Sequence, residues 1–232
     1  MTTQTQPRTQ PRTKPRKALM SWSSGKDSAY ALHLARANPK LEIIGLLTTI
    51  NASADRVAMH GVRHELLRRQ AASLGLPVQV IELPHPCSNE IYEQRMGAAV
   101  ERARELGVEV MIFGDLFLAD IRAYREQQLA GTGLEPVFPL WGADTRELAE
   151  QMLRAGVVAT LTCVDLAKLP IELVGRRWDA SLLRELPEGV DPCGERGEFH
   201  TFVSDGPGFA EPISHQRGEV VERDGFGFAD LL

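Results

Sequence analysis

The sequence predicts an α/β protein built on a parallel sheet and followed by a smaller α+β domain. Apolar runs of strand length alternate with segments of helical periodicity over residues 18–113, which is typical of a parallel sheet with helical crossovers. The run at 41–50 is almost continuously apolar, as expected for a strand covered on both faces. A loop of small residues joins the first strand to the first helix, and such loops bind anions.

The first half of the chain divides into alternating strands and helices. Gly75 and Gly107 each follow a periodic apolar segment, where glycine commonly ends a helix. The expected strands lie at 18–20, 41–50, 77–83 and 108–113, and the expected helices at 29–37, 62–74 and 88–106. Ligands of parallel sheets bind at the carboxyl ends of the strands. If the first and fourth strands are neighbours, the loops that follow them face one crevice.

A domain boundary is expected near Gly131, where Gly and Pro residues interrupt the pattern after a helix at 116–129. Asp144 and Glu147 form a capping-box pattern that opens a helix ending before Gly156, and a strand at 157–164 and a helix at 178–186 follow. From residue 191 onward the chain is rich in Gly and turn residues. The expected units are a disordered basic tail at 1–16, a first domain at 17–131 and a second domain at 132–232.

Composition excludes several classes of protein. The 232 residues contain no apolar run near the length of a membrane span and no N-terminal apolar segment typical of a signal peptide. The three cysteines are far apart and odd in number, which favours a reducing, cytoplasmic compartment over a disulfide framework or zinc knuckle. The C-x-x-C pairs of many thiol-transfer enzymes are also missing from the sequence.

The charge is unevenly distributed along the chain. Residues 1–17 carry five basic residues and no acidic one, whereas the rest has 21 basic and 31 acidic residues, a net charge of −10. A body this acidic is a poor general binder of nucleic acid. The basic tail is either an arm for RNA or an acidic partner, or a solvated segment, and its sparse charges favour the second interpretation.

The loop at 21–28 is the strongest chemical signal. A helix N-terminus offers unpaired N–H groups and the positive end of its dipole, Lys26 adds a point charge for phosphate, and Asp27 suits a Mg²⁺ ion that bridges phosphate oxygens.

The loop lacks the spacing of a Walker A motif, because position 20 is Met and Asp27 follows Lys26. It resembles the pyrophosphate loop of ATP pyrophosphatases, usually S-G-G-K-D-S. Ser24 stands at the first Gly, which predicts a negative φ there.

A second group of charged residues follows the fourth strand. Gly114 at the strand end permits close approach of a ligand or of backbone, and Asp115 is a candidate for the same site. Arg122 and Arg125 share a helix face and suit a phosphate or carboxylate. The alternative for the arginines is a solvated face with internal pairs such as Arg122–Glu126.

His60 and His64 have the i, i+4 spacing of metal ligands on a helix. The H-E-x-x-H pattern is absent, however, and Gly61 suggests that His60 precedes the helix. We expect His60 to lie in a loop near the nucleotide base or ribose, with a plain surface histidine as the alternative.

The third signal is the stretch D-P-C-G-E-R-G-E-F-H-T at 191–201. Acidic residues and a histidine cluster there between glycines, which suits recognition of an amine or a base near an incoming nucleophile. A Glu/Glu/His metal site and a simple turn before an edge strand are the alternatives. Cys193 is expected to be a small packed residue more than a nucleophile. The candidate residues are Gly194, Glu195, Gly197, Glu198, His200 and Thr201.

The loop at 21–28 and the stretch at 191–202 together resemble the diphthine–ammonia ligase family of adenine nucleotide α-hydrolase-like ATP pyrophosphatases. His60-Gly61-Val62, Gly114-Asp115 and the segments at 124–126 and 139–141 support this resemblance, which extends from about residue 17 to 212. It implies a five-stranded, doubly wound, parallel ATP-binding domain followed by a substrate domain. It also implies adenylation of a carboxylate with release of pyrophosphate, and then amidation by ammonia.

The family pattern assigns roles to individual positions. It implies that ATP and Mg²⁺ are held by Ser21, Ser23, Ser24, Gly25, Lys26, Asp27, Ser28, Gly114 and Asp115, with Asp27 on the metal. The acceptor would face Glu195, Glu198, His200 and Thr201. The acceptor would be diphthine on elongation factor two if the source makes diphthamide, and otherwise another carboxylate; a homo-oligomer is compatible with this reading. A tRNA-modifying pyrophosphate-loop enzyme and a non-catalytic nucleotide sensor are the alternative functions.

Overall fold

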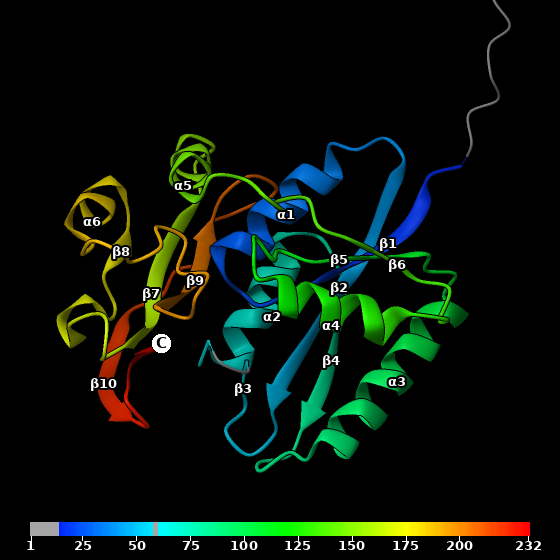
Figure 1. Cartoon of the computed structure of the whole chain (residues 1–232), viewed down its shortest axis with the longest axis horizontal. Coiled ribbons are helices and arrows are strands. Elements are labelled where there is room, and N and C mark those ends of the chain that lie inside the picture. The colour runs from blue at the N-terminus through cyan, green and yellow to red at the C-terminus, as the bar shows by residue number, and fades with distance from the viewer. Residues whose placement is uncertain (1–13, 58–59) are drawn as a thin grey trace, which may run out of the picture.

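The computed structural model describes residues 14–57 and 60–232, and the chain forms two sheets within them. Sheet A comprises β1 (Arg16–Ser21), β2 (Leu41–Asn51), β3 (Arg56–Val57), β4 (Val78–Leu83), β5 (Val110–Ile112) and β6 (Glu135–Val137). Five of these strands run parallel in the order β4-β2-β1-β5-β6, and β3 pairs antiparallel with the end of β2 (Figure 1). The predicted five-stranded parallel sheet is confirmed, with β3 as an addition that the sequence did not indicate.

Helices cover both faces of sheet A, as the doubly wound prediction requires. These helices are α1 (Lys26–Arg36), α2 (His64–Ser73), α3 (Asn89–Glu105) and α4 (Ala119–Leu129). Leu32 and Leu67 of α1 and α2 belong to the same apolar core as Met20 and Ile112 of the sheet. Ala103 of α3 and Leu129 of α4 belong to a second core, on the alternate residues of the same strands. Because successive strand residues point to opposite faces, one sheet supplies both cores.

The first sheet continues beyond the boundary expected near Gly131. β6 pairs parallel with β5 through Val110↔Glu135 and Ile112↔Val137. The chain therefore leaves sheet A after Val137 and reaches the first helix of the second unit, α5 (Thr145–Arg154), through a short loop. The side chain of Asp144 accepts a hydrogen bond from the Glu147 amide at 2.9 Å, so the helix begins at the predicted cap.

Sheet B is antiparallel and forms the second domain. It contains β7 (Val158–Asp165), β8 (Arg177–Trp178), β9 (Phe199–Asp205), β10 (Arg217–Arg223) and β11 (Phe226–Leu231). β7 is central and pairs with β8, β9 and β11. The 3₁₀ turn η1 (Ile171–Leu173) and helix α6 (Ala180–Glu185) complete this domain. The Gly-rich segment from residue 191 thus contains three strands. A strand after the turn was among the alternatives for 191–201, whereas the sequence did not indicate β10 and β11.

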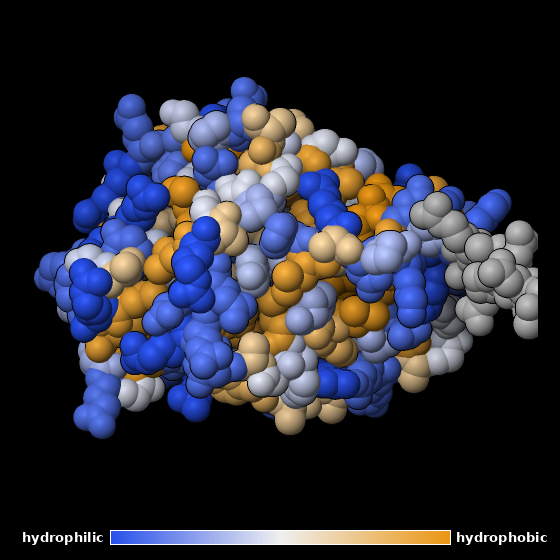
Figure 2. All heavy atoms as spheres, turned by 90° about the horizontal axis from the view of Figure 1, so that it is seen from above, coloured by the Kyte–Doolittle hydropathy of each residue, from blue (hydrophilic) through white to orange (hydrophobic). Residues whose placement is uncertain are grey.

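The two domains share one apolar core. Buried residues of both, such as Leu32 of α1 and Phe202 of β9, belong to one continuous cluster, and α1 packs against β9. Polar residues are dense over the end of the molecule that holds sheet B, with apolar residues visible between them (Figure 2). Among the described residues, none of the helices combines the length and apolarity needed to cross a membrane.

Candidate active site

The loop between β1 and α1 is tightly constrained. The Trp22 amide donates to the Leu47 carbonyl at 2.7 Å, and the Gly25 amide donates to Ser23 Oγ at 3.3 Å. Ser24 adopts φ +69°, so the negative φ expected at this position is wrong. The turn needs left-handed backbone here, and the serine takes the conformation that glycine adopts more readily. The buried Ser24 hydroxyl has no hydrogen-bond partner among the described residues.

Gly114 brings the end of β5 against the start of α1. A Cβ atom at Gly114 would lie 3.0 Å from the backbone of Asp27 and Ser28, so any side chain there would push the helix N-terminus away from the sheet. β1 and β5 are neighbours through Ala18↔Val110 and Met20↔Ile112. The loops after the first and fourth predicted strands therefore face one crevice, as expected.

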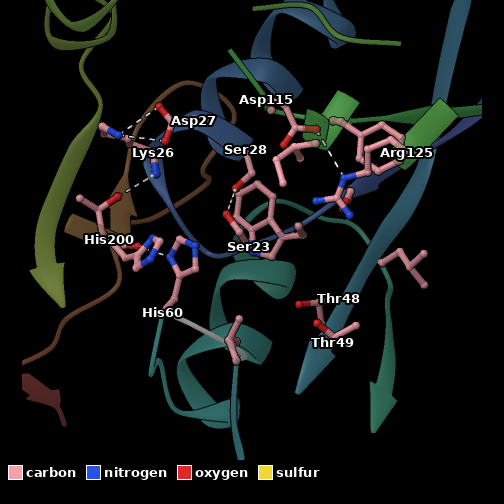
Figure 3. A pocket seen from close by; sticks show the side chains of 18 of the residues that line it. Ser23, Lys26, Asp27, Ser28, Thr48, Thr49, His60, Asp115, Arg125 and His200 are labelled. Carbon is pink, nitrogen blue, oxygen red and sulfur yellow. Dashed lines mark hydrogen bonds and ion pairs between the residues drawn. The ribbon is translucent and has the colours of Figure 1, made fainter. Parts of the chain in front are cut away.

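A cavity of about 530 Å³ lies at the carboxyl ends of the parallel strands and under the second domain (Figure 3). Most of the predicted residues line it: Ser21, Ser23, Lys26, Asp27, Ser28, His60, Gly114, Asp115, Arg125, Gly194, Glu195, His200 and Thr201. Five others do not appear in the lining, namely Ser24, Gly25, Arg122, Gly197 and Glu198. Segments about 170 residues apart in the sequence thus meet in one cavity.

Lys26 points across the boundary between the domains. It is 1% exposed, and its ammonium group lies 2.9 Å from the Asp27 carboxylate. It also donates to the Cys193 carbonyl and lies 5.4 and 5.3 Å from the ring centres of Trp178 and Phe199. Burial opposes its charge, but the neighbouring carboxylate more than compensates, so the pKa of Lys26 is raised and the side chain stays protonated.

Asp115 and Arg125 lie on the wall of the cavity opposite Lys26 and Asp27 (Figure 3). Their closest charged atoms are 3.5 Å apart, and the Arg125 guanidinium lies 5.0 Å from the Phe113 ring centre. Arg122 instead pairs with Glu126 at 2.7 Å and lies over the Phe138 and Trp141 rings. Of the two arginines on this helix, therefore, only Arg125 lines the cavity.

His60 and His200 form a pair of neutral imidazoles. Their ring centres are 4.6 Å apart, and burial lowers the pKa of His60 to about 4 and that of His200 to about 3. Nδ1 of His60 lies 3.0 Å from the Thr201 carbonyl, which can only accept, so Nδ1 carries the proton and Nε2 keeps a lone pair. His64 instead pairs with Asp55, at 3.0 Å. His60 and His64 therefore do not act together as metal ligands.

Glu195 is held at the base of the cavity by backbone amides. Its Oε1 accepts from the Leu116 amide at 2.8 Å and from the Phe117 amide at 3.4 Å. Burial raises the pKa of Glu195 to about 7, the amides oppose this shift, and the negative charges of Asp27 and Asp115 add to it. A carboxyl group with this pKa exchanges protons readily near neutral pH.

Glu198 organises the turn before β9. It is 1% exposed and accepts from the Asp191 amide at 3.3 Å, while Asp191 accepts from the Cys193 and Glu195 amides. The second oxygen of Glu198 has no partner among the described residues. Burial strongly raises the pKa of the Cys193 thiol, which packs as an inert small residue, as expected.

Sequence reasoning missed Gln70 and Trp22. The fully buried Gln70 amide accepts from Trp22 Nε1 at 3.0 Å and donates to the Ser24 carbonyl at 3.1 Å and the Val203 carbonyl at 2.6 Å. One signal was available, because Gln70 is a polar residue on the apolar face marked by Leu66, Leu67 and Leu74. Buried polar side chains are normally hydrogen-bonded, and this one is satisfied by the loop.

A smaller pocket of about 160 Å³ adjoins the main cavity. It lies between α3, α4 and the sheet, where Tyr92, Met96 and Tyr124 contribute to its wall. Leu47, Phe113 and Arg125 line both spaces. The combined site therefore offers an apolar recess beside a larger cavity that holds the charged side chains.

No group of three or more His, Cys, Asp or Glu side chains suited to hold a metal occurs in 14–57 and 60–232. Carboxylates nevertheless line two walls of the cavity, through Asp27 and Asp115. Mg²⁺ commonly takes one or two carboxylates and completes its shell with phosphate oxygens and water. The donor set fits an ion of that kind and is too small for an all-protein metal cage.

A loop at a helix N-terminus, set at the carboxyl ends of a doubly wound parallel sheet and covered by a second domain, is the arrangement of a nucleotide-binding α/β protein. The chain belongs to the diphthamide synthase family. Residues 16–136 match the family model for the diphthamide synthase N-terminal domain, and residues 144–230 match that for the C-terminal domain.

Curated relatives agree with this assignment. The chain is 27% identical to diphthine–ammonia ligase from Bos taurus and from Homo sapiens over 90% of its length and 86% of theirs. It is 28% identical to diphthine–ammonia ligase from Danio rerio, over 90% of both chains. The predicted enzyme class, an ATP-dependent amide ligase, is confirmed.

Proposed function

We propose that this ligase adenylates the carboxylate of diphthine in a protein acceptor and amidates it with ammonia. The relatives carry diphthine and ammonia in their name, and the acceptor protein would be elongation factor two in a source that makes diphthamide. The observation that carries the proposal is the shared cavity. The anion-binding loop of one domain and the Glu195, His200 and Thr201 side chains of the other line the same 530 Å³ space.

In the first step, a carboxylate oxygen of the acceptor attacks the α-phosphorus of ATP and pyrophosphate leaves. Charge develops on the α-phosphate and the leaving pyrophosphate, and the α1 N-terminus together with the Lys26 charge stabilises it electrostatically. Mg²⁺ held by Asp27 or Asp115 would supply further charge stabilisation. Asp115 is the more available ligand, because both Asp27 oxygens lie within 3.1 Å of the Lys26 ammonium.

In the second step, ammonia attacks the acyl carbon, AMP leaves, and one proton must be removed from the nitrogen. Glu195 is our candidate for the base, because its pKa of about 7 matches neutral pH. The histidine pair, with pKa values of about 4 and 3, is a weaker proton acceptor and suits hydrogen bonding to the amine. The apolar recess beside Tyr92 and Met96 suits the adenine ring.

The test is the identity of the products. Purified enzyme, ATP, Mg²⁺ and ammonium are incubated with diphthine-bearing elongation factor or with other carboxylate-bearing proteins and small acids. Acceptor-dependent release of AMP and pyrophosphate, with a loss of about one mass unit on the acceptor, is the expected result. Formation of ADP and phosphate would contradict the proposal. Tight binding of tRNA at moderate salt would instead favour the tRNA-modifying alternative.

A further inference from the structure

The carbonyl groups of Ser24 and Val203 belong to different domains, yet both bind the same side-chain amide. Gln70 Nε2 donates to Ser24 at 3.1 Å and to Val203 at 2.6 Å, and the Val203 amide donates directly to the Ser24 carbonyl at 2.9 Å. The loop at 21–28, the proposed phosphate loop, and strand β9 are thus joined through one buried junction. Since the Gln70 side chain is fully buried, water offers its partners no ready substitute.

The junction holds the loop at its most strained residue. Ser24 has φ +69°, a conformation that is unfavourable for an L-residue, and its carbonyl receives two of the contacts just described. Trp22, two residues earlier, donates its indole N–H to the same glutamine at 3.0 Å. Gln70 therefore fixes the loop on both sides of Ser23.

The same strand reaches the helix end that would bind phosphate. The Lys26 amide donates to Thr201 Oγ1 at 3.2 Å, and a Cβ atom at Gly25 would lie 3.2 Å from the Thr201 carbonyl. Val203 and Thr201 lie two residues apart on β9, so a shift of the strand at Val203 moves the contacts at Lys26. The position of β9 and the shape of the loop cannot vary independently.

We infer that Gln70 is a positioning residue that couples the acceptor domain to the phosphate loop, so that both halves of the active site reach their reactive arrangement together. Gln70 lies outside the cavity lining and contacts no reacting atom. Its effect passes through the Ser24 and Val203 carbonyls. The inference concerns the ligand-free enzyme and rests on the proposed function only where ATP is used as a probe.

Gln70→Met removes all three hydrogen bonds and preserves the length of the side chain. Gln70→Asn keeps a neutral amide but shortens its reach toward the Ser24 and Val203 carbonyls, and it serves if the methionine variant does not fold. Ser73→Ala is the matched control. Ser73 lies on the same helix and binds the second domain through the Glu211 backbone, at 2.7 Å to the carbonyl and 3.1 Å from the amide.

The first measurement is hydrogen exchange of the ligand-free proteins. In Gln70→Met, the amides of Lys26 in the loop and of Val203 in β9 should exchange faster together, by about tenfold or more, since losing one or two buried hydrogen bonds is worth that factor. In Ser73→Ala, faster amide exchange should be confined to the residues near Glu211. Faster exchange over the whole of α2, with Lys26 and Val203 no more affected than other sites, would show a merely structural role and overturn the inference.

The second measurement is the dissociation constant for ATP, obtained by calorimetry. The two variants are compared after allowing for any difference in their loss of thermal stability. Gln70→Met should raise the dissociation constant about tenfold, and Ser73→Ala should leave it within about twofold. Equal losses in the two variants would overturn the coupling. If the parent enzyme itself binds no ATP, the proposed function fails, and the exchange experiment still decides the role of Gln70.

Discussion

The ammonium group of Lys26 lies 5.4 Å from the centre of the Trp178 ring, so a charge of the first domain lies against an aromatic side chain of the second. With the Cys193 carbonyl and the Asp27 carboxylate it completes a buried, fully paired site. Lys26 is therefore part of the contact between the domains as well as of the cavity lining. This dual position makes its substitution a test of both stability and binding.

Lys26→Ala should destabilise the folded protein as well as weaken ATP binding. It leaves the Asp27 carboxylate without its partner and empties the space between Trp178 and Phe199. Removing one member of a buried ion pair costs about 3–5 kcal/mol; Asp27 is partly exposed, so the lower end is expected. Urea unfolding measures the loss. The double variant Lys26→Ala, Asp27→Asn should lose less than the sum of the single losses, and strict additivity would contradict the pairing.

Ser24→Gly should stabilise the protein by about 1–2 kcal/mol. Glycine adopts φ +69° without the strain of an L-residue, and the change removes a buried hydroxyl that lacks a partner. Asp224→Gly is the control, because Asp224 also has positive φ, at 54°, but lies in the β10–β11 turn. Thermal unfolding should show a larger gain for Ser24→Gly. A loss of stability would mean that the hydroxyl makes a contact essential to the loop.

Glu195 should make the stability of the protein depend on pH between about 4.5 and 7. Its ordinary pKa of 4.5 is raised to about 7 in the folded protein. Between these values the folded chain holds a proton that the unfolded chain has released, so stability falls as pH rises through this window. Glu195→Gln removes this slope and should gain stability relative to the parent between pH 5 and pH 8, as measured by urea unfolding.

The activity of the parent should change in the opposite direction from its stability. The amidation rate should rise as pH increases through about 7, because the Glu195 carboxylate is the proton acceptor. In Glu195→Gln the rate, measured at a fixed concentration of unprotonated ammonia, should be about 10²-fold lower, the scale of one positioned base, and should not rise through this pH range. A variant that kept the parent's pH profile would remove Glu195 from the proton transfer.

The His60–His200 pair should make the fold sensitive to acid. Both pKa values are lowered from 6.5, to about 4 and about 3. As pH falls from 6.5 towards 4, the unfolded chain gains protons that the folded chain does not take up, so stability declines. His200→Gln should reduce the decline, and His33→Gln, on α1 outside the cavity lining, is the control. Identical slopes for parent and His200→Gln would contradict the burial effect.

Local patterns predicted the part of the structure that depends on neighbouring residues. The apolar run at 41–50 and the alternation of strands and helices predicted the parallel sheet. The loops that follow β1 and β5 were predicted to face one crevice, and both line the cavity. Ser24 could not be predicted, because its left-handed turn is imposed by Gln70 and Val203. β10 is mostly exposed, and without an apolar alternation its sequence resembles a loop.

Some candidate site residues were harder to predict because their contacts join distant segments. Glu198 has the charge and spacing of a site residue, yet its carboxylate holds the Asp191 turn. Arg122 has the same sequence signature as Arg125, but the Phe138 and Trp141 rings draw it away from the cavity. The position of each side chain depends on contacts with residues that the periodicity of the sequence does not connect to it.

The contact between the Lys26 amide and Thr201 spans 175 positions of sequence, and this has a consequence for biosynthesis. A ribosome makes the phosphate loop early, but the strand that completes its shape emerges only after most of the protein has been translated. The nascent first domain therefore carries an unfinished nucleotide site. Under the proposed function, a chain can use ATP only after its second domain has been made, so a half-made chain cannot consume ATP in the absence of an acceptor.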